Sequence, residues 1–231
     1  MRFGKEKNSE VSPLSFPNAL IGNQWNKLQR VFVKRWIPAF AGMTFLLSFF
    51  YASAIFALPQ IESKDVQYTS TDKTLTIDAP NNAIINYSSF NIGVDESVIF
   101  LQPSSTAQVL NRVIDGPRSD LLGTLSANGI FYLINQSGIY VGPNANISAN
   151  SIFMSTRDIS NDNFKNRIFQ FERTNDDQKD YGMVLDGKVT VAENGFGVFV
   201  AGAFVQGGYI SAAKAKMAMI AADKVRIGFS D

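Results

Sequence analysis

The side chains that could do chemistry in this 231-residue chain are few, because the sequence contains no His and no Cys. Their absence removes imidazole acid–base catalysis, thiol nucleophiles and the commonest zinc ligands. The carboxylates Asp158, Asp162 and Asp176-Asp177 are calcium ligands by type. They lack the spacing of a calcium-binding loop, and isolated Asp residues of this kind are more often solvated turns. The sequence therefore predicts no catalytic residue, no metal site and no cofactor, so we expect a protein that is not an enzyme.

Two further sequence patterns are better explained by structural roles than by ligand binding or catalysis. The glycine-rich residues 195–202 have neither the Lys-Ser/Thr ending of a phosphate-binding loop nor the G-x-G-x-x-G spacing. We interpret them as a strand with glycines at its corners. Lys214, Lys216, Lys224 and Arg226 lie close together without the clustered carboxylates that a polysaccharide lyase would need. They are interpreted as solvated surface.

The charge distribution divides the chain into two parts. Residues 1–57 contain seven Lys/Arg and two Asp/Glu, a net charge of +5, whereas the rest contains 21 − 7 = 14 basic and 20 − 2 = 18 acidic residues, a net of −4. An acidic body does not indicate nucleic-acid binding. Lys34-Arg35 precede an apolar run that ends in small residues, which is the order of a secretory signal peptide. We predict an N-terminal extension and signal peptide over residues 1–57, cleaved after Ala54 or Ala57; a membrane anchor is the alternative.

Residues 58–231 must supply the elements that position any site. They show short alternating or continuous apolar segments between turn residues, and no long helical period, which predicts an all-β domain. Residues 107–115 fit either a strand or one helical turn. Both faces of residues 129–135 are apolar, which also suits a core strand of an antiparallel sandwich. The expected strands are residues 74–78, 83–93, 97–102, 129–135, 138–142, 147–155 and 167–173.

A weak repeat near the C-terminal end indicates a different all-β architecture. Residues 198–208 and 218–228 align at an offset of 218 − 198 = 20 residues, and about 20 residues make one coil of a β-solenoid. In such a fold, inward Val and Ile stack on their equivalents one coil away. The aligned positions are Val200 with Ile220, Ala201 with Ala221, Val205 with Val225, and Gly208 with Gly228.

Five blocks in a fixed order carry a resemblance to a known family. They are residues 57–60, 83–116, 121–147, 151–164 and 197–227. In this order they resemble the N-terminal secretion domain of filamentous-haemagglutinin-type exoproteins, the two-partner secretion family. The resemblance implies a right-handed parallel β-helix over residues 58–231, with extra strands that cap its start.

The resemblance also implies a route and a partner. A protein of this family is secreted, or reaches the cell surface, through the periplasm of a Gram-negative bacterium. An outer-membrane β-barrel transporter with periplasmic repeat domains recognises the domain, with strand addition as the expected mode of contact. The domain then nucleates β-helix folding of an adhesin- or haemagglutinin-like passenger. The alternative is a stand-alone adhesin or carbohydrate-binding β-helix that contacts the host-cell surface, suggested by Tyr132 and Tyr140, which we expect to be exposed.

The candidate site residues are those the resemblance places in its two blocks. The family usually has Asn-Pro-Asn-Gly where this chain has Asn135-Gln136-Ser137-Gly138. We expect a turn with Gly138 at positive φ, less rigid than the family's because Pro and the second Asn are missing. Arg112 alone fits a surface residue beside a turn, whereas the resemblance assigns Asn111 and Arg112 to transporter contact or to bracing the cap. All six residues are therefore candidates for transporter recognition or for a structural turn.

Overall fold

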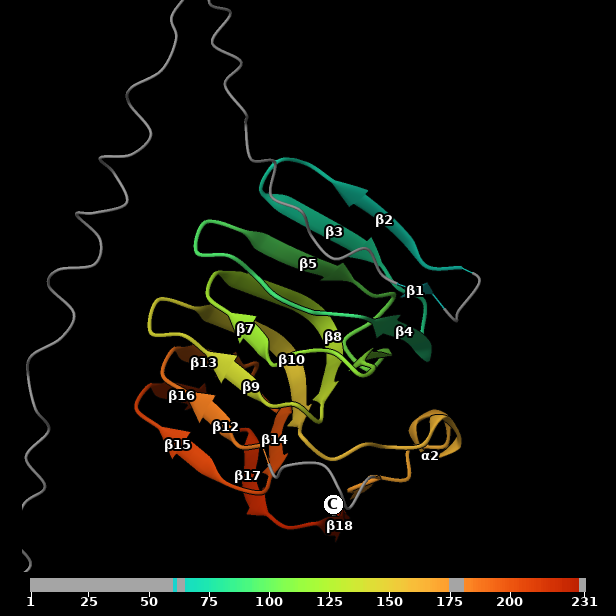
Figure 1. Ribbon diagram of the computed structural model, residues 1–231. Helices are drawn as coiled ribbons and strands as arrows, with labels where there is room; N and C mark the ends of the chain where they lie inside the picture. The colour runs from blue at the N-terminus through green and yellow to red at the C-terminus, as the bar shows by residue number, and fades with distance from the viewer. Residues whose placement is uncertain (1–59, 62–64, 175–180, 229–231) are drawn as a thin grey trace, which may run out of the picture. The chain divides into compact units, whose positions relative to one another are not determined.

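The computed structural model describes residues 60–61, 65–174 and 181–228 (Figure 1). Ala54, Ala57 and the rest of the predicted leader lie outside the described residues, so the signal peptide and its cleavage stay predictions. Within the described ranges, no helix is both long and apolar enough to cross a membrane. The same ranges consist mainly of strands, with a single short helix, α2 (Asn161–Lys165).

Most strands run parallel and stack coil upon coil, which gives a β-solenoid of about six turns and confirms the predicted fold (Figure 1). We distinguish three faces of the solenoid. The first face consists of β3 (Thr74–Asp78), β5 (Ser97–Leu101), the first halves of β8 (Thr124–Asn135) and β10 (Asn146–Ser155), β13 (Lys188–Val191) and β16 (Tyr209–Ala212).

The second and third faces continue each coil around the same core. The second face consists of β4 (Ala83–Tyr87), β6 (Gln108–Val113), the second halves of β8 and β10, β14 (Phe196–Ala201) and β17 (Lys216–Ala221). The third face consists of β7 (Ser119–Leu121), β9 (Ile139–Val141), β12 (Met183–Leu185) and β15 (Phe204–Gln206). Residues 107–115 thus contain a strand, and the helical alternative is wrong.

Antiparallel strands close the N-terminal end of the solenoid. β1 (Gln60–Ile61) pairs with β4, and β2 (Gln67–Ser70) pairs with β3, both antiparallel. They lie at the end of the stack where the first coil would otherwise leave a row of unpaired backbone groups, as Figure 1 shows. These are the capping strands that the resemblance implied.

The 20-residue repeat is confirmed in its first half and wrong in its second. Val200 on β14 pairs with Ile220 on β17, in register with Ala201 and Ala221. Val205, however, pairs with Val184 on the third face. Val225 lies on β18 (Lys224–Arg226), which leaves the solenoid and pairs antiparallel with β11 (Gln170–Glu172). The sequences still align at an offset of 20 residues, but β18 does not occupy the third face as β15 does.

Between β10 and β12 the chain leaves the coil and covers the outer side of the second face. We call residues 156–173 together with β18 the cover. Ser160 caps α2 by accepting a hydrogen bond from the backbone N–H of Asn163 at 3.1 Å. Phe164, Phe171 and Val225 from the cover pack on outward side chains of the second face, forming an apolar cluster separate from the core inside the solenoid.

The cover explains why both faces of residues 129–135 are apolar. Phe131 and Leu133 point into the solenoid core, whereas Ile130, Tyr132 and Ile134 point into the cluster beneath the cover. The parallel registers exclude the antiparallel sandwich. The expectation that Tyr132 is exposed is wrong: its side chain is buried, and its ring stacks on Phe153 with centroids 4.4 Å apart.

Candidate functional site

Asn111 and Arg112 are neighbours on β6, so their side chains point to opposite sides of the second face. Asn111 points inward and is fully buried. Its Oδ1 accepts a hydrogen bond from the Tyr87 hydroxyl at 3.1 Å, and its Nδ2 donates to the Tyr132 carbonyl at 3.0 Å. Burial raises the pKa of the Tyr87 phenol, so this hydroxyl stays a neutral donor. In the folded domain, Asn111 links adjacent coils from inside.

Arg112 points outward and holds the cover against the solenoid. Its Nε donates to Asp158 Oδ1 at 2.8 Å and its Nη1 to Asn161 Oδ1 at 2.9 Å, while Nη2 donates to the Ile159 carbonyl. The Arg112 side chain is 12% exposed. A guanidinium whose donors are shared among three acceptors on one segment braces that segment, and here the segment belongs to the cover.

The Asn-Gln-Ser-Gly segment forms the turn between β8 and β9. Asn135 Oδ1 accepts from the Ser137 backbone N–H at 2.9 Å, and the Gly138 N–H donates to the Asn135 carbonyl at 3.1 Å. The Asn135 amide also donates to the Pro117 carbonyl and to Ser119 Oγ in the preceding coil, each at 2.9 Å. Gly138 has φ of +104°, which confirms the positive φ expected there. The side chain of Asn135 thus stabilises the turn without proline.

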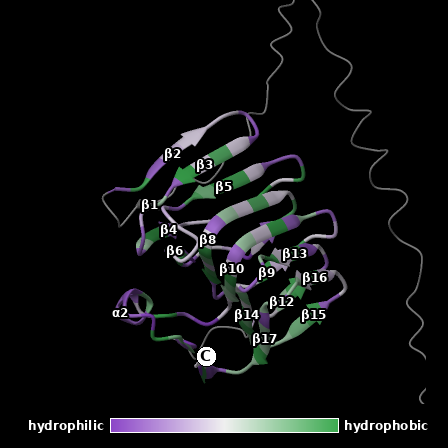
Figure 2. Cartoon of the chain, turned by 180° about the vertical axis from the view of Figure 1, so that it is seen from behind, coloured by the Kyte–Doolittle hydropathy of each residue, from purple (hydrophilic) through white to green (hydrophobic). Residues whose placement is uncertain are grey.

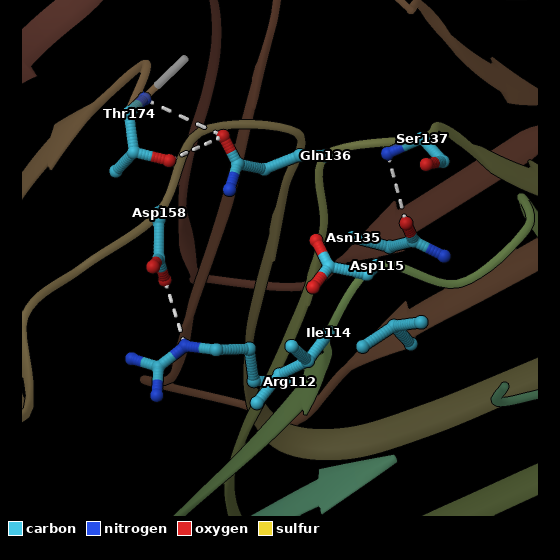
Figure 3. Close-up of a pocket in the computed structure, with 9 residues that line it drawn as sticks. Arg112, Ile114, Asp115, Asn135, Gln136, Ser137, Asp158 and Thr174 are labelled. Atoms are coloured by element: carbon cyan, nitrogen blue, oxygen red, sulfur yellow. Dashed lines mark hydrogen bonds and ion pairs between the residues drawn. The ribbon is translucent and has the colours of Figure 1, made fainter. Parts of the chain in front are cut away.

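Four of the six candidate residues line one cavity, which we call the groove (Figure 3). Its volume is about 460 Å³. Figure 3 shows the Arg112–Asp158 ion pair and the Gln136–Thr174 contact, in which Gln136 Oε1 accepts from Thr174 Oγ1 at 3.0 Å. Asn111 and Gly138 do not line it. The lining residues are Arg112, Val113, Ile114, Asp115, Asn135, Gln136, Ser137, Asp158 and Thr174.

The groove presents hydrogen-bonding groups of several kinds. Amide, hydroxyl and carboxylate groups suit recognition of a peptide or polar side chain. Within the ranges that the structure describes, no group of three or more Asp and Glu side chains is placed to hold a metal ion. The side chains brace the turn and leave polar groups that face the groove.

Arg157 is a structural residue that the sequence analysis did not single out. It is 2% exposed and belongs to the largest fully buried side chains. Its Nε donates to the Ala222 carbonyl at 2.8 Å and its Nη2 to Asp223 Oδ1 at 3.0 Å. It therefore ties the start of the cover to the chain just before β18. The signal that the sequence offers is its position two residues after the end of an apolar strand.

Replacement of Asn135 by alanine is expected to lower the free energy of unfolding by roughly 2 kcal/mol, because it leaves Ser119 Oγ and the Pro117 carbonyl without a buried donor. Equilibrium urea denaturation measures this. The matched control is Gln136→Ala, which removes the contact with exposed Thr174 and is expected to cost less than about 1 kcal/mol. Equal effects of the two variants would contradict a structural role for Asn135.

A parallel β-solenoid closed by antiparallel capping strands, with a polar groove beside the corner between β8 and β9, defines the class as a capped β-helix domain. The model of the family described as the TPS secretion domain matches residues 59–227. The chain therefore belongs to the TPS, or two-partner secretion, domain family. Membership supports a role in secretion rather than in catalysis.

Similar proteins agree with this assignment. The chain is 34% identical over 114 residues, 49% of its length, to a heme/hemopexin-binding protein of Haemophilus influenzae. A second such protein, from strain Rd, is 34% identical over 113 residues. The matched region makes up 12% of each of these relatives. The crystal structure of the HMW1 secretion domain from Haemophilus influenzae matches with a TM-score of 0.71 and 34% identity, over 74% of this chain and 45% of that one.

Proposed function

We propose that this domain directs export by two-partner secretion, through recognition by an outer-membrane β-barrel transporter with periplasmic repeat domains. The protein passes through the periplasm of a Gram-negative bacterium and is released or kept at the cell surface. Outside, the domain nucleates the β-helix of an adhesin- or haemagglutinin-like passenger. The observation that carries the proposal is the family match over residues 59–227, together with a solenoid that is capped at its N-terminal end and whose last described coil pairs, within the described residues, on one side only.

The open end supports the nucleation step. Among the strands that the structure describes, β15, β16 and β17 each pair with the preceding coil only. Met217 and Met219 point inward, in register with Gly197 and the buried Phe199, yet they are 38% and 40% exposed. A further coil would bury these side chains and pair with the free strand edges, which is how a solenoid propagates.

Two surfaces of the domain support recognition by the transporter. Within the described part of the chain, β2 pairs with β3 alone and its four residues are all exposed, which suits strand addition at its outer edge. The groove offers Gln136 and Ser137 on a turn whose shape is held by Asn135. The absence of Cys suits a chain that must thread a pore without crosslinks.

Substituting the two partly exposed turn side chains, as Gln136→Ala with Ser137→Ala, is expected to reduce export several-fold while the domain still folds. The loss follows from removal of groove hydrogen bonds to the transporter. The measurement is the ratio of secreted to cell-associated protein in cells that carry the cognate transporter. Ser88→Ala with Ser105→Ala, on exposed positions outside the groove, is the control. Equal export of both double variants would contradict recognition at the turn.

The alternative function, a host-surface adhesin, was suggested by two tyrosines that we expected to be exposed. Tyr132 is buried beneath the cover. Tyr140 is partly buried on the third face, and the Arg118 guanidinium lies 5.0 Å from the centre of its ring. Neither residue supports an aromatic binding surface.

A further inference from the structure

The charged side chains that line the groove do not balance one another. Arg112 is the cation of the lining, and Asp115 and Asp158 are its carboxylates, so their net charge is 1 − 2 = −1. Arg112 and Asp158 form an ion pair at 2.8 Å. Among the residues that the structure describes, Asp115 has no hydrogen-bond or ion-pair partner. The groove therefore contains one carboxylate whose charge is not compensated.

The backbone just after β6 holds Asp115 in the groove. Its φ is +51°, a left-handed conformation that Asp and Asn adopt more readily than most residues. The residue is exposed. Figure 3 shows the carboxylate of Asp115 pointing into the groove, across from Asp158. A ligand in the groove would thus meet carboxylate oxygens on two sides.

The other groups of the groove suit a peptide. Gln136 Oε1 already accepts from the backbone N–H and Oγ1 of Thr174, at 3.4 and 3.0 Å. This leaves Gln136 Nε2 as a donor for a peptide carbonyl, and the Ser137 hydroxyl can donate or accept. Ile114 is 46% exposed and adds apolar surface beside Asp115. The methylene stem of a long side chain can pack against such a surface.

The groove differs from the outer surface of the first face. Figure 2 shows apolar and polar residues alternating along β3, β5, β8 and β10. The alternation places apolar residues such as Leu75 and Val98 in the solenoid core. The groove, by contrast, has a volume of about 460 Å³, and ligand pockets have volumes of roughly 300–1,000 Å³. It can therefore enclose one long side chain together with the adjoining peptide groups.

We propose that the groove binds an arginine or lysine side chain on the periplasmic part of the transporter, with Asp115 facing its positive charge. This inference rests on the proposed function and adds the chemistry of the contact. An acidic side chain would meet the charge of Asp115 with like charge, while Arg112 is already paired with Asp158. A neutral side chain would leave Asp115 without a counter-charge. Charge complementarity of this kind sets partner choice and the salt dependence of association.

The test measures the dissociation constant between the full chain and the purified cognate transporter. It is made at ionic strengths of about 0.01 M and about 0.15 M, at which charges are screened over about 30 Å and about 8 Å. Asp115→Asn keeps the size of the side chain and suits the same backbone conformation. It is expected to weaken binding about fivefold at the lower ionic strength and to reduce the salt dependence of binding.

Asp95→Asn is the matched control, because it makes the same change of net charge at an exposed position outside the groove. It is expected to change the dissociation constant by less than about twofold. Equal melting temperatures of the two variants show that a loss of binding does not come from unfolding.

The results separate this inference from the proposed function. If the unmodified chain binds and Asp115→Asn behaves as Asp95→Asn does, the cationic contact is wrong and the proposed function stands. An unchanged salt dependence in Asp115→Asn would also overturn the contact, since the carboxylate would then act as a hydrogen-bond acceptor only. Failure of the unmodified chain both to bind and to be exported would overturn the proposed function and this inference with it.

Discussion

Replacement of Gly187 by alanine is expected to lower the free energy of unfolding by roughly 3 kcal/mol. A Cβ at this corner would lie 2.3 Å from the Gly142 carbonyl oxygen and 2.9 Å from that of Ala145, both backbone atoms of the preceding coil. Backbone cannot move aside as a flexible side chain can, so the two coils must separate locally. The equivalent contact recurs at the same corner one coil later, where a Cβ on Gly208 would lie 2.2 Å from the Gly187 carbonyl oxygen.

Gly228→Ala is the control for this substitution, because a Cβ there would meet no atom within 4 Å. We expect its free energy of unfolding to stay within about 0.5 kcal/mol of the unmodified chain. Urea denaturation followed by circular dichroism measures both variants. If Gly187→Ala is as stable as Gly228→Ala, the coils do not approach each other at the corner as closely as described.

Replacement of Phe153 by alanine is expected to lower the free energy of unfolding by about 3–5 kcal/mol, the range for a buried aromatic side chain. The Phe153 ring is 1% exposed and contacts Tyr132 and Phe196 from the solenoid and Phe169 and Phe171 from the cover. Loss of this ring removes the centre of the apolar cluster that packs the cover against the second face.

Release of the cover distinguishes this effect from a general loss of stability. Limited proteolysis is expected to cut residues 156–173 in Phe153→Ala before it cuts the solenoid. Leu101→Ala, at a position that is 47% exposed, is the control and is expected to change stability by less than about 0.5 kcal/mol. Uniform proteolysis of both regions would show that the cover and solenoid unfold together.

The parallel coils were predictable from apolar periodicity and from the match of Val200 to Ile220, because stacked coils place equivalent residues in register. The cover was not predictable from the same signals. Residues 161–165 form a helix too short to show a period, and β18 follows the spacing of a solenoid coil although it pairs antiparallel with β11. Local pattern does not reveal which strand a segment joins when the partner is distant in sequence.

The candidate site was predictable in part. The turn at Asn135 to Gly138 and its positive φ followed from the residue types together with the resemblance to the family's turn. The opposite directions of Asn111 and Arg112 follow from the alternation of a strand once β6 is assigned. The burial of Arg157 and Tyr132 did not follow from the sequence, because both depend on the cover, whose position is set by contacts across the fold.

The pairing of β11 with β18 has a consequence for the order in which the domain is completed. Phe171 and Val225, which are paired, are separated by 225 − 171 = 54 residues, and the chain between them builds β12 through β17. If the chain arrives at its folding site from the N-terminal end, the coils can stack one after another as they emerge. The cover is complete only when residues 224–226 have arrived and β18 pairs with β11. Its completion therefore stabilises coils that have already stacked.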